Sequence, residues 1–166
     1  NKTSDFPTTL VVGCGGAGKA AAAAAVTLGM KTVLMNRNPE RAYRLAEDLT
    51  GAGFDAEARP LDDFRTCFAE ADIIIYNIPT SIPVLNELDE TDFHGPSRTE
   101  EHQQKFILEA NYKDPSFDNL LIDKMMNANP HIHYTRGQKW LLYQAVTGYR
   151  IFTGDTPNLT AMEAVI

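Results

Sequence analysis

Short apolar runs alternate along the 166-residue chain with longer segments of helical pattern. These runs predict strands at Thr9–Val12, Lys31–Met35, Ile73–Tyr76, Phe106–Ala110 and His131–Tyr134, and a strand with a weaker pattern is expected near Ala56–Arg59. The intervening segments predict helices at Gly16–Leu28, Pro39–Leu49, Leu61–Phe68, Asn119–Asn127 and Gln138–Val146. Between Ile78 and Gln104 the chain is rich in charges, Pro and Gly, and we expect irregular structure there.

Strands that alternate with helices require crossover connections, which produce a parallel sheet. The runs around Leu10, Val33 and Ile74 are apolar on both faces, as expected when helices cover both sides of the sheet. We therefore predict one domain over residues 1–166, with the doubly wound α/β fold of the Rossmann type. The alternative is an α/β domain of another topology.

A glycine-rich loop distinguishes between these two folds. Residues Gly13–Gly18 match G-x-G-x-x-G, directly after the first predicted strand and at the start of the first helix. Gly13 allows the tight turn, Gly15 allows a pyrophosphate to approach the backbone, and Gly18 allows close packing of helix and sheet. Free N–H groups at the helix start, at Gly16 and Ala17, would face the phosphates. The alternative is a glycine turn that binds nothing.

The end of the second predicted strand indicates which dinucleotide is bound. NAD sites place an Asp or Glu there to bind the ribose 2′-OH. This chain has Arg37 instead, with Arg41 one helical turn further on and Asn36 and Asn38 beside Arg37. Guanidinium groups match a 2′-phosphate in charge and geometry, so the sequence predicts NADP(H). The alternative is that both arginines are ordinary surface charges.

The composition of the chain argues against several classes of binding partner. The net charge is −7 and no cluster of Lys and Arg is present, which argues against nucleic acid and anionic membranes as partners. No apolar run approaches the ~20 residues of a membrane-spanning helix. Two distant cysteines, Cys14 and Cys67, indicate a reduced, cytoplasmic protein.

Several segments together resemble the shikimate dehydrogenase family. The loop from Gly13 and the Asn36–Ala42 segment resemble that family's GAGGAG(R/K)A and NRTxx(K/R)A motifs. The segment Gly137–Ala145 is similar to its GxxMLxxQA helix, and Phe152–Pro157 to its (F/W)TGxxP ending. Glu109–Pro115 resembles its strand-end segment with Tyr and Pro. These matches run from Leu10 to about Pro157, in family order.

The resemblance implies a function and further site residues. It implies reversible hydride transfer between NADPH and 3-dehydroshikimate, with Tyr112 and Gln144 facing the substrate. It places Trp140, which replaces a Met, near the nicotinamide, and relates Tyr76–Thr80 to the family's segment after the fourth strand. The residues that we expect to contact NADP(H) are Gly13, Gly15, Gly16, Ala17, Asn36, Arg37, Asn38, Arg41, Asn77, Gly137 and Trp140.

The resemblance also implies an N-terminal substrate domain that supplies a catalytic Lys and Asp. Because the glycine loop lies near residue 10, we expect that domain to be absent from this chain and name no catalytic residue in it. Lys113 is a less favoured candidate. His131 and His133 would share one strand face, but without a third ligand they predict no metal site. Two alternatives stay open: an enzyme acting on quinate, and a non-catalytic NADPH-binding module.

Overall fold

The computed structural model describes residues 7–94 and 104–165, and within them the predicted sheet is present. Six strands lie in the order β3-β2-β1-β4-β5-β6, and every pair is parallel. Their bounds are β1 Thr8–Val12, β2 Lys31–Met35, β3 Ala56–Ala58, β4 Ile73–Tyr76, β5 Lys105–Glu109 and β6 Ile132–Thr135. This order is that of the doubly wound dinucleotide-binding fold, so the predicted fold class is confirmed.

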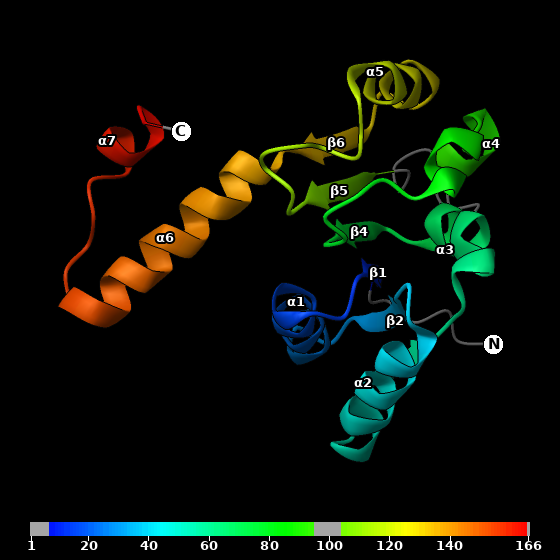
Figure 1. Cartoon of the computed structure of the whole chain (residues 1–166), viewed down its shortest axis with the longest axis horizontal. Helices are drawn as coiled ribbons and strands as arrows, with labels where there is room; N and C mark the ends of the chain where they lie inside the picture. Colours follow the sequence, from blue (N-terminus) through cyan, green and yellow to red (C-terminus); the bar gives the residue numbers. More distant parts are fainter. Residues whose placement is uncertain (1–6, 95–103, 166) are drawn as a thin grey trace.

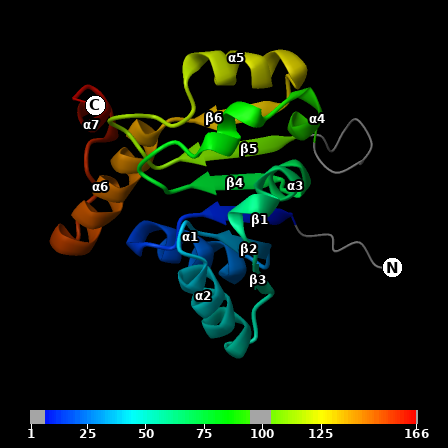
Figure 2. The ribbon, with the colours of Figure 1, turned by 45° about the vertical axis from the view of Figure 1, so that its right-hand side comes forward.

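Helices cover both faces of the sheet (Figures 1 and 2). One face carries α1 Gly16–Thr27, α2 Pro39–Gly51 and the first turns of α6 Gly137–Thr153. The other carries α3 Phe64–Glu70, α4 Glu90–Phe93 and α5 Asn119–Ala128. The strands' side chains therefore enter two separate apolar clusters, which is why the central strands carry apolar side chains on both faces in Leu10–Val12, Val33–Met35 and Ile73–Tyr76.

Alanines let α1 pack closely against the sheet. Ala21, Ala22 and Ala25 are buried there, while Ala20, Ala23 and Ala24 of the same run are exposed. Gly29, at φ 81°, ends the helix in the left-handed conformation that glycine adopts without strain.

The structure differs from the sequence prediction in its short and terminal helices. The stretch expected to be irregular contains a 3-10 helix at Pro83–Glu87 and the one-turn helix α4. In α4 the side chains of Asp89 and Asp92 form a capping box, in which Asp takes the position where Glu or Gln is usual. Helix α6 continues to Thr153, and α7, at Leu159–Glu163, was not predicted.

One lysine is fully buried at the amino-terminal edge of the sheet. The Nζ of Lys105 donates hydrogen bonds to the carbonyl oxygens of Phe68 (2.6 Å), Ala69 (3.2 Å) and Ala71 (2.7 Å). These carbonyls end α3, so the ammonium satisfies acceptors that the helix itself leaves free. Burial lowers the pKa of Lys105 to about 8, and the group is therefore still mostly protonated at neutral pH.

Replacing Lys105 by methionine should destabilise the domain by about 1–3 kcal/mol, because buried carbonyls lose their donor. Methionine keeps most of the volume, so the loss reports the hydrogen bonds rather than a cavity. Urea denaturation of Lys105→Met and of the exposed control Lys113→Met measures the effect. Equal midpoints for Lys105→Met and the wild type would show that these hydrogen bonds contribute nothing to stability.

Candidate dinucleotide site

The glycine loop lies where the strand order changes direction, between β1 and β4. The chain leaves β1 at Gly13, whose N–H donates to the Met35 carbonyl of β2 (2.7 Å). On the other side, the Asn77 N–H that follows β4 donates to the Val12 carbonyl (2.7 Å). The crevice between these two loops is the position at which open parallel sheets bind ligands.

Three glycines have distinct roles in this loop. Gly13 has a φ of 103°, and a Cβ there would lie 3.0 Å from the carbonyl carbon of Asn77. A Cβ on Gly18 would lie 1.7 Å from the Gly13 carbonyl oxygen, so only glycine fits between helix and loop. Gly15 differs, since its Cβ would meet open space within 4 Å. That open space, beside the uncapped N-terminus of α1, is where a phosphate would have room.

Asn36 connects the glycine loop to the loop after β2. Its Oδ1 accepts from the Cys14 N–H (3.0 Å), and its Nδ2 donates to the Asn38 carbonyl (2.8 Å). Asn38 in turn caps α2, because its Oδ1 accepts from the Glu40 N–H (3.1 Å). Both side chains that we expected beside a 2′-phosphate therefore already hold backbone groups of their own loops.

A basic cleft adjoins the glycine loop. It has a volume of about 450 Å³ and is lined by Arg41 together with Cys14, Gly15, Gly16, Lys19, Arg44, Leu45 and Asp48. Arg37 does not line this cleft; its Nη1 donates to Thr80 Oγ1 (3.4 Å) in the loop after β4. The two arginines predicted to act together thus flank the loop after β2 from different sides.

Burial keeps the nearby thiol neutral. Cys14 is 2% exposed, and desolvation raises its pKa to about 11. The thiol is therefore protonated at neutral pH, and no thiolate charge opposes an anion in the cleft.

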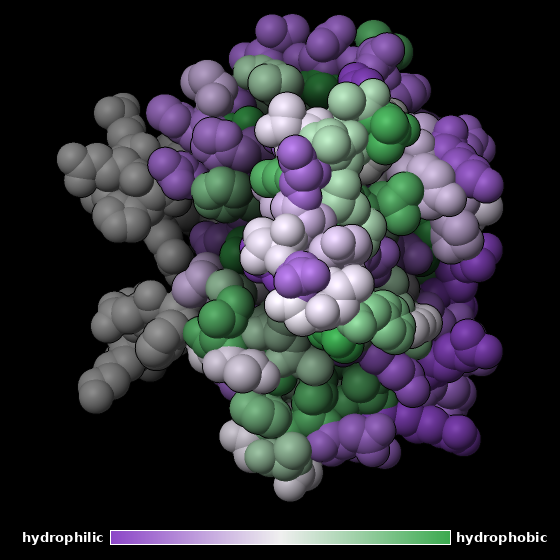
Figure 3. Space-filling view, turned by 90° about the vertical axis from the view of Figure 1, so that its left-hand side faces the viewer, coloured by the Kyte–Doolittle hydropathy of each residue, from purple (hydrophilic) through white to green (hydrophobic). Residues whose placement is uncertain are grey.

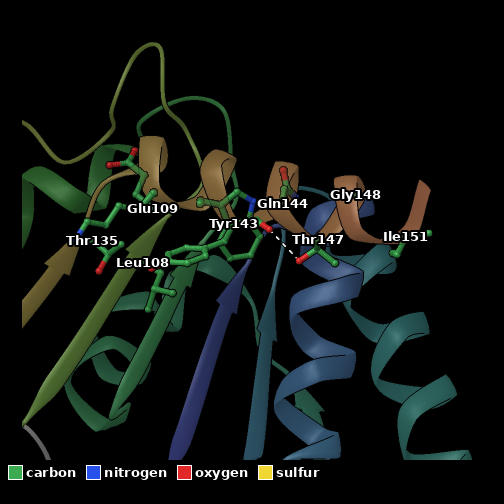
Figure 4. A pocket seen from close by; sticks show the side chains of 10 residues that line it. Leu108, Glu109, Thr135, Tyr143, Gln144, Thr147, Gly148 and Ile151 are labelled. Atoms are coloured by element: carbon green, nitrogen blue, oxygen red, sulfur yellow. Dashed lines mark hydrogen bonds between the residues drawn. The ribbon is translucent and has the colours of Figure 1, made fainter. Parts of the chain in front are cut away.

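A larger cavity of about 890 Å³ lies along α6, on the same side of the sheet as α1 (Figure 4). Trp140 and Gln144 line it, as do Leu108, Glu109, Thr135, Lys139, Tyr143, Thr147, Gly148 and Ile151. Leucine, isoleucine and aromatic side chains form much of the lining, and Gln144, Lys139, Thr135 and Thr147 add polar groups. Tyr112, expected beside Gln144, is 40% exposed and does not line this cavity.

Gly137 and Asn77 both make close contacts with the backbone at the carboxyl-terminal edge of the sheet. A Cβ on Gly137 would lie 2.4 Å from the Asn111 carbonyl oxygen, so glycine lets α6 start against the loop after β5. Asn77 Nδ2 donates to the Ile75 carbonyl (3.3 Å), while its Oδ1 is buried without a partner among the described residues. The structure therefore places Asn77 beside Gly13 and Gly137 beside Tyr112.

Three residues at these sites, Lys19, Arg44 and Glu109, were not predicted from the sequence. Arg44 lies three residues after Arg41 on α2, a spacing that puts both side chains on one helix face and could have indicated it. Lys19 follows Gly18 in the first turn of α1. Its position next to the glycine loop could have indicated that it lies near the phosphates. Glu109 begins the segment that resembles a family motif, but nothing in the sequence indicated a role for its side chain, because an acid at a strand end usually points to solvent.

The two histidines predicted to share a strand face lie in different surroundings. His131 precedes β6, and the ring of His133 stacks on Phe106 with centroids 4.9 Å apart. Over residues 7–94 and 104–165, no group of three or more His, Cys, Asp or Glu side chains could hold a metal ion. Within the same ranges, no helix is both long enough and apolar enough to cross a membrane.

Comparison with known proteins places this site in a family. The model of the shikimate / quinate 5-dehydrogenase family matches residues 2–111, about two thirds of the chain. The chain belongs to the shikimate / quinate 5-dehydrogenase family. Its motifs from Gly13 to Arg41 lie within the matched region, so the resemblance seen in the sequence is confirmed.

Individual members of the family match over nearly the whole chain. NADP(+) shikimate dehydrogenase of Methanothermobacter thermautotrophicus is 30% identical over 156 residues, 93% of this chain and 52% of that enzyme. The enzyme of the same name from Carboxydothermus hydrogenoformans is 27% identical over 158 residues, 95% of this chain and 53% of that enzyme. The chain spans about half the length of the curated relatives it matches.

A solved family structure has the same fold. The shikimate 5-dehydrogenase of Thermus thermophilus in complex with shikimate superposes with a TM-score of 0.66 and 25% identity. The match covers 94% of this chain and 51% of that one. This chain therefore corresponds to about half of a shikimate 5-dehydrogenase chain.

Proposed function

We propose that this chain is the NADP(H)-binding domain of a shikimate dehydrogenase. The observation that carries the proposal is the basic cleft of Lys19, Arg41 and Arg44 beside an open glycine loop, with no acid at the end of β2. The parent reaction would be the reversible reduction of 3-dehydroshikimate by NADPH. The names of the relatives, NADP(+) shikimate dehydrogenases, support the cofactor and the substrate.

The described residues fit such a cofactor. The open space at Gly15 would admit the pyrophosphate, and the N–H groups at the start of α1 would bind it. Arg41 and Arg37 would bind the 2′-phosphate from two sides, with Lys19 and Arg44 adding positive charge. Bound NADPH supplies the hydride, and the protein positions it.

The cavity along α6 is the proposed place for the nicotinamide and one side of the substrate. Trp140 would pack against the nicotinamide, and Gln144 could both donate to and accept from substrate hydroxyls. Tyr112, at the same edge of the sheet, would border the substrate from the loop after β5. None of the charge pairs among the described residues joins a Lys to an Asp at this edge.

The catalytic Lys and Asp would come from an N-terminal substrate domain. The exposed apolar surface around α6 and α1 supports such a partner (Figure 3). Ile151 is 75% exposed and Phe152 90% exposed on α6. An apolar groove between α1 and the start of α6 is lined by Ala24, Leu28, Phe106 and Trp140, with other residues of α1, β4 and β5. Patches of this kind commonly mark interfaces.

Two alternatives remain distinguishable by experiment. The family's name includes quinate, and the choice between shikimate and quinate would depend largely on the other domain. A non-catalytic NADPH-binding module would retain the basic cleft but show no turnover when joined to the rest of its protein. We place the protein in the cytoplasm, which the two free cysteines support.

The proposal predicts a preference for NADP(H) over NAD(H) that depends on Arg37 and Arg41. Losing one charge-assisted contact should cost roughly 1.5–3 kcal/mol, or on the order of tenfold to a hundredfold in affinity for NADP. Affinity for NAD should hardly change, because NAD lacks the 2′-phosphate. Calorimetric titration of the wild type, Arg37→Ala and Arg41→Ala with both dinucleotides measures this.

Arg150→Ala is the matched control, since Arg150 is exposed on α6 away from the cleft. It should behave as the wild type. Equal affinities of the wild type for NAD and NADP would overturn the cofactor assignment. An Arg37→Ala protein that keeps the full preference would remove Arg37 alone from the 2′-phosphate site.

A further inference from the structure

Glu109, the last residue of β5, is a carboxylate with no exposed surface. Among residues 7–94 and 104–165, no ion pair includes Glu109. Burying a charge without a cation is costly unless strong hydrogen bonds replace its water. The hydrogen-bond partners of Glu109 must therefore offset the cost of burying it.

Three donors surround the carboxylate. Tyr134 of β6 donates its hydroxyl to Oε2 at 2.5 Å. The backbone N–H of Ser116 donates to Oε1 through a short hydrogen bond, and that of Phe117 approaches Oε2 at 3.5 Å. Hydrogen bonds to an ionised acceptor are roughly twice as strong as neutral ones. Glu109 thus fixes the far end of the loop 110–118 to the strand on which that loop begins.

Aromatic packing holds the same end of the loop. The Phe117 ring lies between Tyr76 of β4, with ring centroids 5.5 Å apart, and Tyr134 of β6, at 5.7 Å. Phe117 is 1% exposed. The carboxylate of Glu109 and the ring of Phe117 together restrict the C-terminal end of the loop 110–118.

The rest of the loop connects the two segments that border the proposed nicotinamide position. Asn111 Nδ2 donates to the Pro79 carbonyl after β4 (3.2 Å). Gln138 Nε2, in the first turn of α6, donates to the Tyr112 carbonyl (3.3 Å). The close approach at Gly137 places the Asn111–Tyr112 peptide directly on the start of α6. A displaced loop would therefore displace Tyr112 and the helix turn that carries Trp140.

Glu109 also forms part of the wall of the cavity. In Figure 4 its carboxylate is turned away from Leu108 and Tyr143, toward the loop, so its methylene stem is the part nearer the cavity. The carboxylate therefore holds protein groups rather than a ligand.

We propose that Glu109 is a positioning residue, whose buried carboxylate holds the loop 110–118 and, through the Asn111–Tyr112 peptide, the first turn of α6, which carries Trp140 to the nicotinamide. This proposal rests on the proposed function, because it assumes that the nicotinamide binds along α6. It assigns Glu109 no contact with the cofactor, the substrate or a transferred proton.

The test separates the two ends of the cofactor. Adenosine 2′,5′-bisphosphate carries the 2′-phosphate half alone, whereas NADP+ adds the nicotinamide. Trp140 is the only tryptophan in the chain, and quenching of its fluorescence by the oxidised nicotinamide requires close contact. Titration of the wild type with both ligands, followed by calorimetry and by tryptophan emission, provides the reference.

In Glu109→Gln the amide can no longer accept from three donors, so the loop should shift. We expect affinity for NADP+ to fall about tenfold and tryptophan quenching at saturation to fall by at least half. Affinity for adenosine 2′,5′-bisphosphate should stay within about twofold, which a general loss of folding would not allow. Tyr134→Phe, which removes one hydroxyl, should give smaller changes of the same sign. Glu70→Gln, an exposed acid at the opposite edge of the sheet, should leave every value unchanged.

Each other outcome is decisive. Wild-type quenching in folded Glu109→Gln and Tyr134→Phe would overturn the positioning role; if Glu109→Gln fails to fold, Tyr134→Phe alone decides. A wild type that binds the bisphosphate but shows no quenching by NADP+ would overturn the role and leave the cofactor assignment intact. A wild type that binds neither ligand would instead overturn the proposed function.

Discussion

Replacing Gly15 by valine should abolish NADP(H) binding while the domain stays folded. Gly15 has φ −79° and ψ −165°, which a branched residue adopts without strain, and its Cβ would meet open space. That open space is where the proposed pyrophosphate lies, so the valine side chain would occupy it. Losing two hydrogen bonds to a charged phosphate at about 1.5–3 kcal/mol each corresponds to a loss of more than roughly a hundredfold in affinity.

Circular dichroism and calorimetric titration on one sample test this expectation. Gly51→Val is the matched control, because a Cβ there also meets open space but lies at the far end of α2. The control should bind as tightly as the wild type. Tight binding by folded Gly15→Val would place the phosphates elsewhere in the structure.

A protein consisting of these 166 residues should bind NADP(H) but not oxidise shikimate. The described part of the cleft contributes Gln144 and Tyr112, which can border a substrate, but no Lys–Asp ion pair that could transfer the proton. A positioned acid or base typically contributes ~10²–10⁴-fold to such a reaction. Holding the substrate against the nicotinamide contributes further, and one half of a cleft cannot do so.

Nicotinamide absorbance at high protein concentration, with shikimate and NADP, measures any turnover. A fusion of the chain to a family substrate domain is the positive control, and quinate in parallel tests the alternative substrate. Turnover by the 166 residues alone would overturn the proposal that the catalytic Lys and Asp come from a separate substrate domain. Lys113, in the loop after β5, would then be the first candidate for the proton-transferring group.

The sequence predicted the sheet well because its signals were local. Ile73–Tyr76 is a continuous apolar run and Lys31–Met35 ends in three apolar residues, and both strands have the predicted bounds. The loop at Gly13 fixed the topology, since that glycine pattern is useful only between a strand and a helix. Helix α4 was missed because four residues are too short for a periodic pattern to emerge.

Part of the site was predictable because some of its residues belong to local sequence motifs. Gly15, Arg41 and Gln144 each line a cleft or cavity of the structure, as motif positions should. The divergence of Arg37 toward Thr80 depends on a residue 43 positions away, which spacing cannot reveal. The same holds for Glu109, whose three donors come from an adjacent loop and from β6.

The central position of β1 implies a gradient of local stability across the site. This strand is hydrogen-bonded to β2 on one side and β4 on the other, and the glycine loop leaves directly from it. Helix α6 instead touches the sheet mainly near its start, and its side chains are exposed from Tyr149 on (Figure 1). Local opening should thus be rarest where phosphates would bind and commonest where a substrate would meet the protein. The domain would hold one end of a dinucleotide rigidly and leave the other end adaptable.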